Sequence, residues 1–384
     1  MNLKKQSQVA LDVPPAMSVK FNMMVYDLKR KGVDVTTLSL GEAFFKLPDC
    51  SFDALEIEKG YHYSSSLGTP ELRERICRYY RDTYGVIASP QKEMLISAGS
   101  KAIIFMALLS VVDPGDEVII IEPAWVSYVE QVKLAYGNPV MVPYHKSIAE
   151  LESYITEKTK VIIINNPNNP SGKVYSKTEL DQLLEIARKH GLYIISDEAY
   201  SDFVDEEPFI SVGAVDVDKE RTFTVNSLSK CFGMSGWRIG YVIASEGIIE
   251  SMLKLNQHLI TCPPTILQDY LARYFDEIVS AVQPQVKEVV QKRKLVAEYM
   301  DEIGLTYLPG TATFYFMVSI EESKLDSEEF ATKLLNERHV STVPGIGYGD
   351  SVSKFIRVSV GTETMERIER GLDEINSLIK ETHG

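Results

Sequence analysis

One lysine in this sequence stands in a setting that suits covalent chemistry with carbonyl compounds. The stretch 222–241, TFTVNSLSKCFGMSGWRIGY, runs from a predicted buried strand into a serine-rich turn that carries Lys230. A lysine forms a Schiff base with a carbonyl compound when burial or nearby cations lower its pKa. Ser227 precedes it by three residues and Arg238 follows by eight, and both types bind phosphate. A surface lysine beside an unrelated arginine is the alternative interpretation.

A carboxylate and a phenol follow a second predicted strand. In LYIISDEAY, residues 192–200, Asp197 ends the apolar run and Tyr200 comes three residues later. Opposite unit charges about 4 Å apart attract by ~4 kcal/mol at an effective dielectric near 20, or about three pKa units. Asp197 would therefore keep a pyridine nitrogen protonated, and Tyr200 would reach a neighbouring phenolic oxygen. A helix cap and a core tyrosine are the alternatives.

Three further features follow three other predicted strands. Two Asn-Pro steps in NNPNNPSG impose an extended turn that presents Asn169. The segment LISAGSKA places Gly99, Ser100 and Lys101 at a predicted helix start, where free N–H groups favour a phosphate. Trp125 is suited to stacking on a flat ring. Turns and core packing explain each feature singly, but together the five supply what a phosphorylated pyridine aldehyde requires.

The elements that must position these residues alternate along the middle of the chain. Continuous apolar runs predict strands buried on both faces of a mostly parallel sheet, at 93–97, 117–121, 139–142, 161–165, 192–196, 222–226 and 239–244. Helical patterns lie between them at 101–112, 126–135 and 177–190. The last is bounded by Ser176 and Glu179 as a capping box and by Gly191. This alternation predicts a three-layer α/β/α domain.

The chain ends have a different pattern and predict a smaller α+β domain. A long helix at 286–303, strands at 314–318 and 355–360, and helices at 327–339 and from 364 onward are expected there. The N-terminal helix at 19–31 joins them. We therefore expect a large domain at 46–284 and a small domain formed by 1–45 and 285–384.

Composition excludes several classes of function. The 384 residues carry a formal charge of −14, which disfavours binding to nucleic acid. The longest apolar run, 102–112, is far shorter than the ~20 residues of a membrane span, and the N-terminus does not predict a signal peptide. The cysteines, at 50, 77, 231 and 262, include no CxxC pair, so we expect no metal site and a cytoplasmic location.

In these motifs, and over nearly its whole length, the chain resembles the class I/II aminotransferases among the fold-type I pyridoxal phosphate enzymes. The family pattern Asn-Pro-x-Asn-Pro-Thr/Ser-Gly stands at 166–172, and Asp-x-x-Tyr stands at 197–200. Ser-x-Ser-Lys with an arginine eight residues later stands at 227–238. The resemblance implies a transferase of nitrogenous groups that uses pyridoxal 5′-phosphate and a ping-pong mechanism.

The resemblance also implies roles for individual residues. Lys230 would carry the cofactor and shuttle the proton, Asp197 would face the pyridine nitrogen, and Asn169 and Tyr200 would face the phenolic oxygen. The phosphate would lie against Ser227, Arg238 and the Gly99–Lys101 turn, with Trp125 stacked on the ring. Arg357 would hold the substrate α-carboxylate, and the backbone of Gly41 would approach the substrate. Tyr63 would reach the phosphate of a neighbouring subunit, which implies a homodimer with shared active sites.

The substrate is inferred from similarity to a bacterial subgroup of aspartate aminotransferases. In that subgroup the residues that match Lys101 and Ser18 bind the distal carboxylate of acidic substrates, so we expect an aspartate or glutamate donor with 2-oxoglutarate as acceptor. The chain departs from the subgroup at Gly-Glu-Ala-Phe-Phe-Lys, residues 41–46, and at Lys20 and Met24. These departures would fit an enzyme for an aromatic, keto-sugar or secondary-metabolite intermediate.

Other reactions and classes compete with this hypothesis. A β-lyase or decarboxylase would use the same cofactor motifs. A regulator built on this fold is disfavoured because a DNA-binding domain would be expected ahead of the first helix. A nicotinamide dehydrogenase is disfavoured because the glycines at 345, 347 and 349 lack the third position of GxGxxG.

Overall fold

A seven-stranded mixed sheet forms the centre of the larger part of the molecule. A computed structural model describes residues 4–205 and 208–384. The strand order is β2-β8-β7-β6-β5-β3-β4, and only β8 runs antiparallel to its neighbours. The strands are β2 (Met94–Ser97), β3 (Glu117–Ile121), β4 (Asn138–Val142), β5 (Thr159–Asn165), β6 (Tyr193–Asp197), β7 (Thr222–Ser227) and β8 (Gly240–Ile243). The predicted mostly parallel sheet is confirmed.

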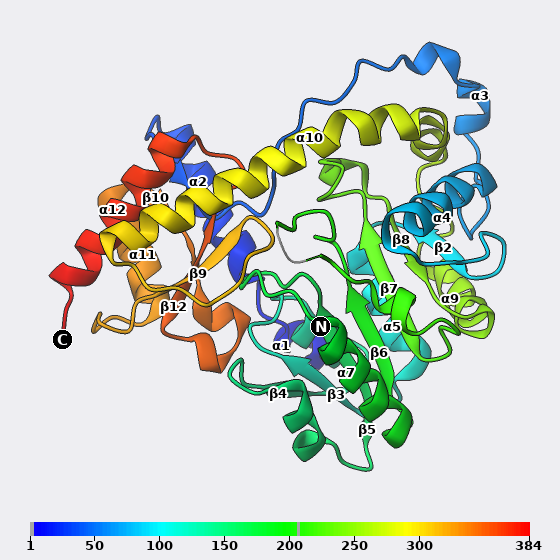
Figure 1. Cartoon of the computed structure of the whole chain (residues 1–384), viewed down its shortest axis with the longest axis horizontal. Coiled ribbons are helices and arrows are strands. Elements are labelled where there is room, and N and C mark those ends of the chain that lie inside the picture. Colours follow the sequence, from blue (N-terminus) through cyan, green and yellow to red (C-terminus); the bar gives the residue numbers. More distant parts are fainter. Residues whose placement is uncertain (1–3, 206–207) are drawn as a thin grey trace.

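Helices cover both faces of this sheet, as its apolar strands require (Figure 1). Ile120 and Ile163 pack in one hydrophobic cluster with residues of α5 (Ser100–Val111), α6 (Tyr128–Leu134) and α9 (Glu246–Leu259). Their chain neighbours Ile119 and Ile162 point to the other face, against α7 (Lys177–His190). Because successive side chains of a strand alternate between faces, this arrangement is the predicted α/β/α layering.

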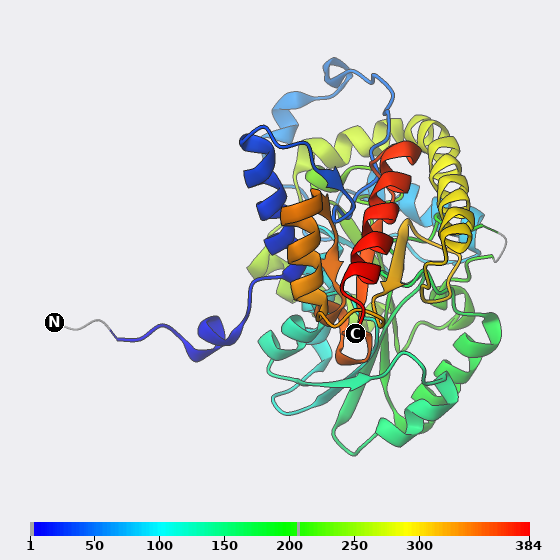
Figure 2. The same cartoon turned by 90° about the vertical axis from the view of Figure 1, so that its left-hand side faces the viewer.

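The chain ends come together in a second, smaller group of elements. Its antiparallel sheet has the order β11-β12-β9, with β11 (Val343–Pro344), β12 (Phe355–Ser359) and β9 (Tyr315–Ser319). A two-residue parallel ladder pairs β1 (Thr36–Thr37) with β10 (Val340–Ser341). The helices there are α2 (Met17–Arg30), α11 (Ser327–Arg338) and α12 (Met365–Glu381), and the short α1 (Gln8–Asp12) projects away from the body (Figure 2).

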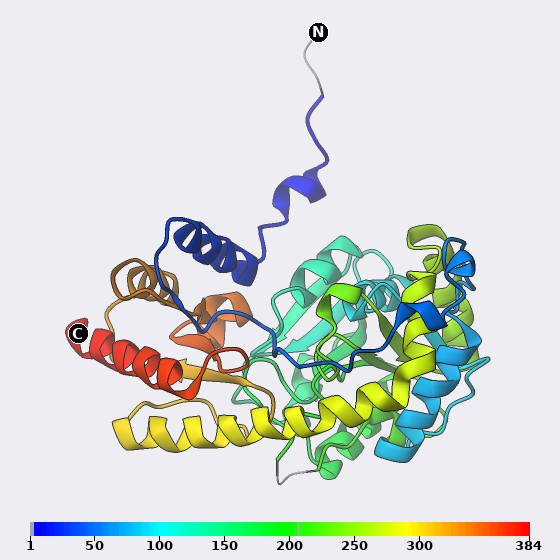
Figure 3. The ribbon, with the colours of Figure 1, turned by 90° about the horizontal axis from the view of Figure 1, so that it is seen from above.

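The long helical segment α10 (Thr265–Ile303), which is kinked at Tyr274, connects the two groups. The sequence predicts a helix at 286–303, but α10 runs from Thr265 to Ile303 through Pro284 (Figure 3). It packs against α4 (Pro70–Tyr84) and α3 (Ile57–Gly60) at one end and against α12 at the other. The predicted domain boundary at 284/285 therefore falls inside one helix, and that boundary remains a proposal. Among the described residues, no helix is both long and apolar enough to cross a membrane.

Candidate active site

One cavity of about 510 Å³ lies where the carboxyl ends of the central strands meet the chain-end elements. It brings together most of the residues that the sequence singled out. They are Ser18, Gly41, Ser100, Lys101, Trp125, Asn169, Asp197, Tyr200, Ser227, Lys230, Arg238 and Arg357. Parallel strands present their carboxyl ends at one edge, which explains why residues far apart in the chain meet here.

The antiparallel direction of β8 explains the position of Arg238. Gly240, the first residue of β8, pairs with Ser227 at the end of β7 and with Ser97 at the end of β2. The segment that enters β8 therefore lies at the same edge as the carboxyl ends of its two neighbours. Arg238 precedes β8 by two residues, so the reversal brings its guanidinium to the start of α5.

Lys230 is half-buried and lines the cavity. Its Nζ donates a hydrogen bond to the carbonyl of Gly41 at 2.5 Å. Burial lowers the pKa of Lys230 to about 8, although Glu42 opposes this effect. Arg357 and Arg238 lower the pKa further by charge repulsion. An amine with this pKa is partly neutral near pH 7 and is able to attack a carbonyl carbon.

Asp197 ends β6 and is held by two hydrogen bonds. Its Oδ2 accepts from the hydroxyl of Tyr128 at 2.7 Å, and its Oδ1 accepts from the backbone amide of Ala199 at 3.2 Å. Burial raises the pKa of Asp197, whereas both hydrogen bonds and the charge of Lys230 lower it. The carboxylate is thus fixed in orientation and faces the cavity.

Replacing Tyr128 by phenylalanine is expected to weaken the electrostatic interaction between Asp197 and a protonated ring nitrogen. A hydrogen bond to a charged group contributes about 1.5–3 kcal/mol, and this one lowers the pKa of Asp197, so its loss raises that pKa. We expect kcat to fall about 3- to 10-fold and the pH titration of the bound cofactor's absorption to shift. Tyr241→Phe, a buried tyrosine outside the cavity lining, is the matched control. An unchanged titration in Tyr128→Phe would contradict this role.

A network of phenols links the turn after β5 to the chain-end sheet. The Tyr200 hydroxyl accepts from Nδ2 of Asn169 at 3.1 Å and lies 3.0 Å from the Tyr315 hydroxyl. The guanidinium of Arg357 stacks over the Tyr315 ring at 4.6 Å and donates to the Ser39 carbonyl at 2.7 Å. This network holds Arg357 and Asn169 on one side of the cavity.

The start of α5 forms a cradle that a phosphate fits. The first N–H groups of a helix have no intrahelical acceptors and attract anions. Gly99 caps α5 with φ of 84°, and a side chain there would collide with the Arg238 guanidinium. A side chain at Gly240 would collide with the Ser100 amide. Two glycines therefore keep this space open beside an arginine, so the residues present fit the phosphate of pyridoxal phosphate.

Some predicted residues lie elsewhere. Tyr63 is 85% exposed and lines a separate surface cavity near α3. Lys20 forms an ion pair with Glu328 at 2.5 Å, and Met24 packs against Phe21 and its neighbours. The backbone of Lys46 bonds to Gln285. Lys20, Met24 and Lys46 are absent from the described lining of the cavity, so these departures do not alter its walls directly.

Several residues of the site were not singled out from the sequence, among them Tyr315, Tyr128, Glu42 and Ser235. Tyr315 and Tyr128 lie in apolar segments that predict only core packing, although Tyr128 follows Trp125 closely. Glu42 accepts a hydrogen bond from the Ser235 hydroxyl at 2.6 Å, and both line the cavity. The position of Glu42 directly after Gly41 is the signal that could have found it.

Comparisons with known proteins agree with this geometry. The model of the family "Aminotransferase class I and II" matches residues 33–375. An aspartate aminotransferase of Pyrococcus abyssi is 36% identical over 93% of this chain and 95% of the relative. An aromatic-amino-acid aminotransferase of Thermococcus litoralis is 34% identical over the same shares.

A solved structure shares the whole architecture. The aspartate aminotransferase of Thermus thermophilus with maleate superposes with a TM-score of 0.91 at 30% identity, over 98% of this chain and all of that one. The family resemblance drawn from the motifs is therefore confirmed. The matched family and the fold together show that this chain belongs to the class I and II aminotransferases, enzymes that depend on pyridoxal phosphate.

Proposed function

We propose that this aminotransferase moves the amino group of aspartate or glutamate to a 2-oxo acid such as 2-oxoglutarate. The observation that carries the proposal is the charge of the cavity. Lys101 and Arg357 both line it, and neither forms an ion pair with an acidic side chain among the described residues. The cavity is also lined by Glu42 and Asp197 and by Lys230 and Arg238, which the cofactor would occupy, so Lys101 and Arg357 are the two cations left for a substrate with two carboxylates.

Arg357 is the proposed partner of the substrate α-carboxylate. Its Nη2 is held by the Ser39 carbonyl, while its Nε is buried without a hydrogen-bond partner among the described residues. A buried donor without a partner costs free energy that a bound carboxylate would recover. The close approach of Gly41, where a side chain would contact the Tyr315 hydroxyl and the Arg357 guanidinium, keeps this space open.

The proposed mechanism is ping-pong and uses one base twice. The bound cofactor supplies an electron sink for the charge that develops at the substrate Cα. Lys230 would hold the cofactor until the donor amine replaces it, and its freed amine would then carry a proton from the substrate Cα to the cofactor. Asp197 would keep the ring nitrogen protonated, and Arg357 would orient the Cα–H bond toward Lys230. Water would supply the carbonyl oxygen of the released 2-oxo acid, and the acceptor would undergo the reverse sequence.

Replacing Lys101 by glutamine is expected to discriminate between acidic and neutral donors. The change keeps the stem and removes the charge, so kcat/KM for aspartate should fall about 10- to 100-fold, because a hydrogen bond to a charged group contributes about 1.5–3 kcal/mol. Alanine, which has no distal carboxylate, should change by less than about threefold. A donor panel with 2-oxoglutarate as acceptor measures both values, and Ser18→Ala should give a smaller loss of the same kind.

The same panel contains the results that oppose the proposal. Negligible turnover with both acidic donors in the wild-type enzyme would contradict an acidic substrate. Release of pyruvate from a β-substituted amino acid without any acceptor would support a β-lyase instead. If the absorption spectrum of the bound cofactor changed when an amino acid was added and changed back when a keto acid was added, that result would support transamination.

The proposed assembly is a homodimer in the cytoplasm. Tyr63 and its exposed neighbours Phe52, Ile57 and Tyr61 form an apolar area on the segment before α4. Exposed apolar areas of this kind suit a protein interface, and the family pattern assigns Tyr63 to the active site of the other subunit. The four cysteines are free thiols, as expected in a reducing compartment. Sedimentation equilibrium, which should give twice the 43.2 kDa of the chain, tests the pairing.

A further inference from the structure

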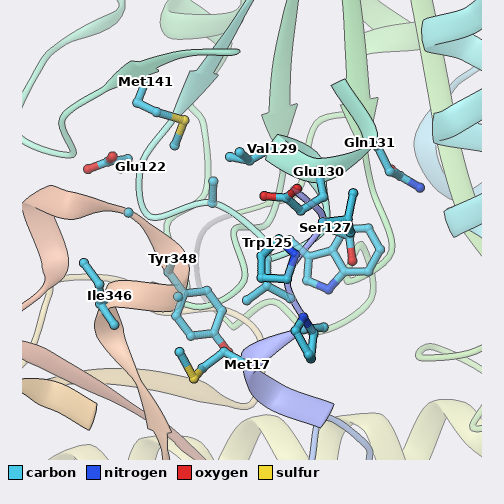
Figure 4. A pocket seen from close by; sticks show the side chains of 18 of the residues that line it. Met17, Glu122, Trp125, Ser127, Val129, Glu130, Gln131, Met141, Ile346 and Tyr348 are labelled. Carbon is cyan, nitrogen blue, oxygen red and sulfur yellow. The ribbon is translucent and has the colours of Figure 1, made fainter. Parts of the chain in front are cut away.

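A second cavity, of about 530 Å³, adjoins the active-site cavity (Figure 4). Both cavities are lined by Lys101 and Trp125, and the Lys101 Nζ lies 4.9 Å from the centre of the Trp125 ring. Ala16 and Met17 line the second cavity, whereas Ser18 and Val19, the next residues of the chain, line the first. The two spaces therefore meet at these side chains and at the first turn of α2.

The walls of the second cavity are mainly apolar. Val129 on α6, Met141 on β4 and Ile346 in the turn after β11 contribute them, and Figure 4 shows the Tyr348 ring beside Met17. Its volume lies within the roughly 300–1,000 Å³ of small-molecule sites. An apolar group such as an aromatic ring suits this space.

Polar atoms without partners stand in the walls of the same cavity. Oε2 of Glu130 and Oε1 of Gln131 are buried and make no hydrogen bond within the described residues. Gln131 is 7% exposed, so water does not compensate it freely. Both atoms accept only. They favour a ligand group that donates a hydrogen bond.

The charges of the walls restrict the ligand further. Glu122, Glu130 and Asp350 line the cavity, against Lys101 alone. Glu122 is already used, because its oxygens accept from the amides of Asp350 and Ser351. Glu130 keeps one free oxygen, since only its Oε1 is paired with Lys133, at 2.9 Å. A carboxylate would be repelled here, whereas a neutral or cationic donor group would be attracted.

We propose that the second cavity is a side-chain subsite for amino acids whose long apolar side chain ends in a hydrogen-bond donor, such as an aromatic amine. The inference rests on the proposed function, because the α-carboxylate of this substrate would lie against Arg357 in the first cavity. The side chain would pass Lys101 and reach Glu130. A ping-pong enzyme binds its two substrates in turn at one site, so acidic substrates would use Lys101 and the longer ones would use this subsite.

Two changes at neighbouring residues of α6 test the subsite. Val129→Phe fills the cavity, and its matched control Val129→Ala leaves the cavity open. Glu130→Gln keeps the shape and removes the charge. The donors are aspartate, phenylalanine and 4-aminophenylalanine, with 2-oxoglutarate as acceptor, and kcat/KM is measured for each.

The subsite predicts a distinct pattern. Wild-type enzyme should prefer 4-aminophenylalanine over phenylalanine at least about fivefold, a preference that Glu130→Gln should abolish. Val129→Phe should lower turnover of 4-aminophenylalanine at least about tenfold and leave aspartate within about twofold. Val129→Ala should leave both donors within about threefold. If the enzyme turned over aspartate but neither aromatic donor, or if Val129→Phe affected all donors equally, the subsite would be overturned and the proposed function would stand.

A binding measurement separates this inference from the proposed function. Tryptophan fluorescence is measured in a Trp237→Phe background, so that Trp125 alone reports, and is titrated with 3-(4-aminophenyl)propanoate, which has no amino group at Cα and does not react. Tight binding to wild type and Val129→Ala that weakens at least about tenfold in Val129→Phe would support the subsite even if acidic donors were not turned over. Equal binding to all three proteins would overturn it.

Discussion

Replacing Lys230 by alanine is expected to lower kcat at least about 10³-fold and to abolish covalent attachment of the cofactor. General acid–base catalysis alone contributes about 10²- to 10⁴-fold, and Lys230 is both the proposed base and the point of attachment. Its Nζ is the lysine amine that the cavity presents beside Gly41, and alanine removes it without filling the space. Activity with aspartate and borohydride reduction of the loaded protein measure the two losses.

The pH dependence of cofactor loading tests the same residue without turnover. The pKa of Lys230 is lowered to about 8, chiefly by burial. Attack on the cofactor aldehyde needs the neutral amine, so the loading rate of cofactor-free enzyme should rise through pH 8 and level off near pH 9. A rate that instead kept rising to pH 10 would show that Lys230 has an ordinary lysine pKa.

Lys173→Ala is the control for this pair of measurements. Lys173 also follows a strand of the central sheet, but it forms an ion pair with Glu179 at 2.8 Å and is absent from the described lining of the active-site cavity. The Lys173→Ala variant should bind the cofactor and turn over aspartate as the wild-type enzyme does. If Lys230→Ala still formed a borohydride-reducible adduct and turned over, the assignment of that lysine would be wrong.

Replacing Asp197 by asparagine is expected to lower kcat about 10³-fold while the fold is kept. The attraction between a carboxylate and a protonated ring nitrogen is equivalent to about three pKa units, and the neutral amide removes it. The side chain keeps its size, so packing against Tyr128 and the position at the end of β6 are preserved. Turnover of aspartate and the absorption of the bound cofactor across pH 5–9 measure the loss.

The adjacent carboxyl group provides a matched control. Glu198 is also buried and its pKa is raised to about 8, chiefly by burial, but it accepts hydrogen bonds from Ser211 and Ser196 and from the amide of Val212, away from the cavity. Glu198→Gln should change kcat by less than about threefold. A wild-type pH profile in Asp197→Asn would show that Asp197 does not protonate the ring.

Local signals in the sequence predicted the central elements well. The helix at 177–190 is observed as α7, with the predicted capping box of Ser176 and Glu179 and with Gly191 in the left-handed region. The continuous apolar runs correspond to the seven strands within two residues at each end. These features depend on neighbouring residues and on burial on both faces, which a single sequence records directly.

Contacts between distant segments were less predictable. The start of α10 was missed: the structure extends the predicted helix at 286–303 back to Thr265 with a kink at Tyr274, and packing against α4 and α12 stabilises its two ends. Lys20 was expected near the site, but Glu328 on α11, 308 residues away in the chain, pairs with it. No local pattern indicates such a partner.

The motifs alone were sufficient to infer the family, the cofactor and the order of the chemical groups, because spacing within a turn is a property of the chain itself. Tertiary packing was needed for everything that depends on two distant segments. The hydrogen bond from Tyr128 to Asp197, the stacking of Arg357 on Tyr315 and the second cavity behind Lys101 and Trp125 each join elements from different parts of the chain. Their geometry is set by how strands and helices pack, so it emerged only from the folded structure.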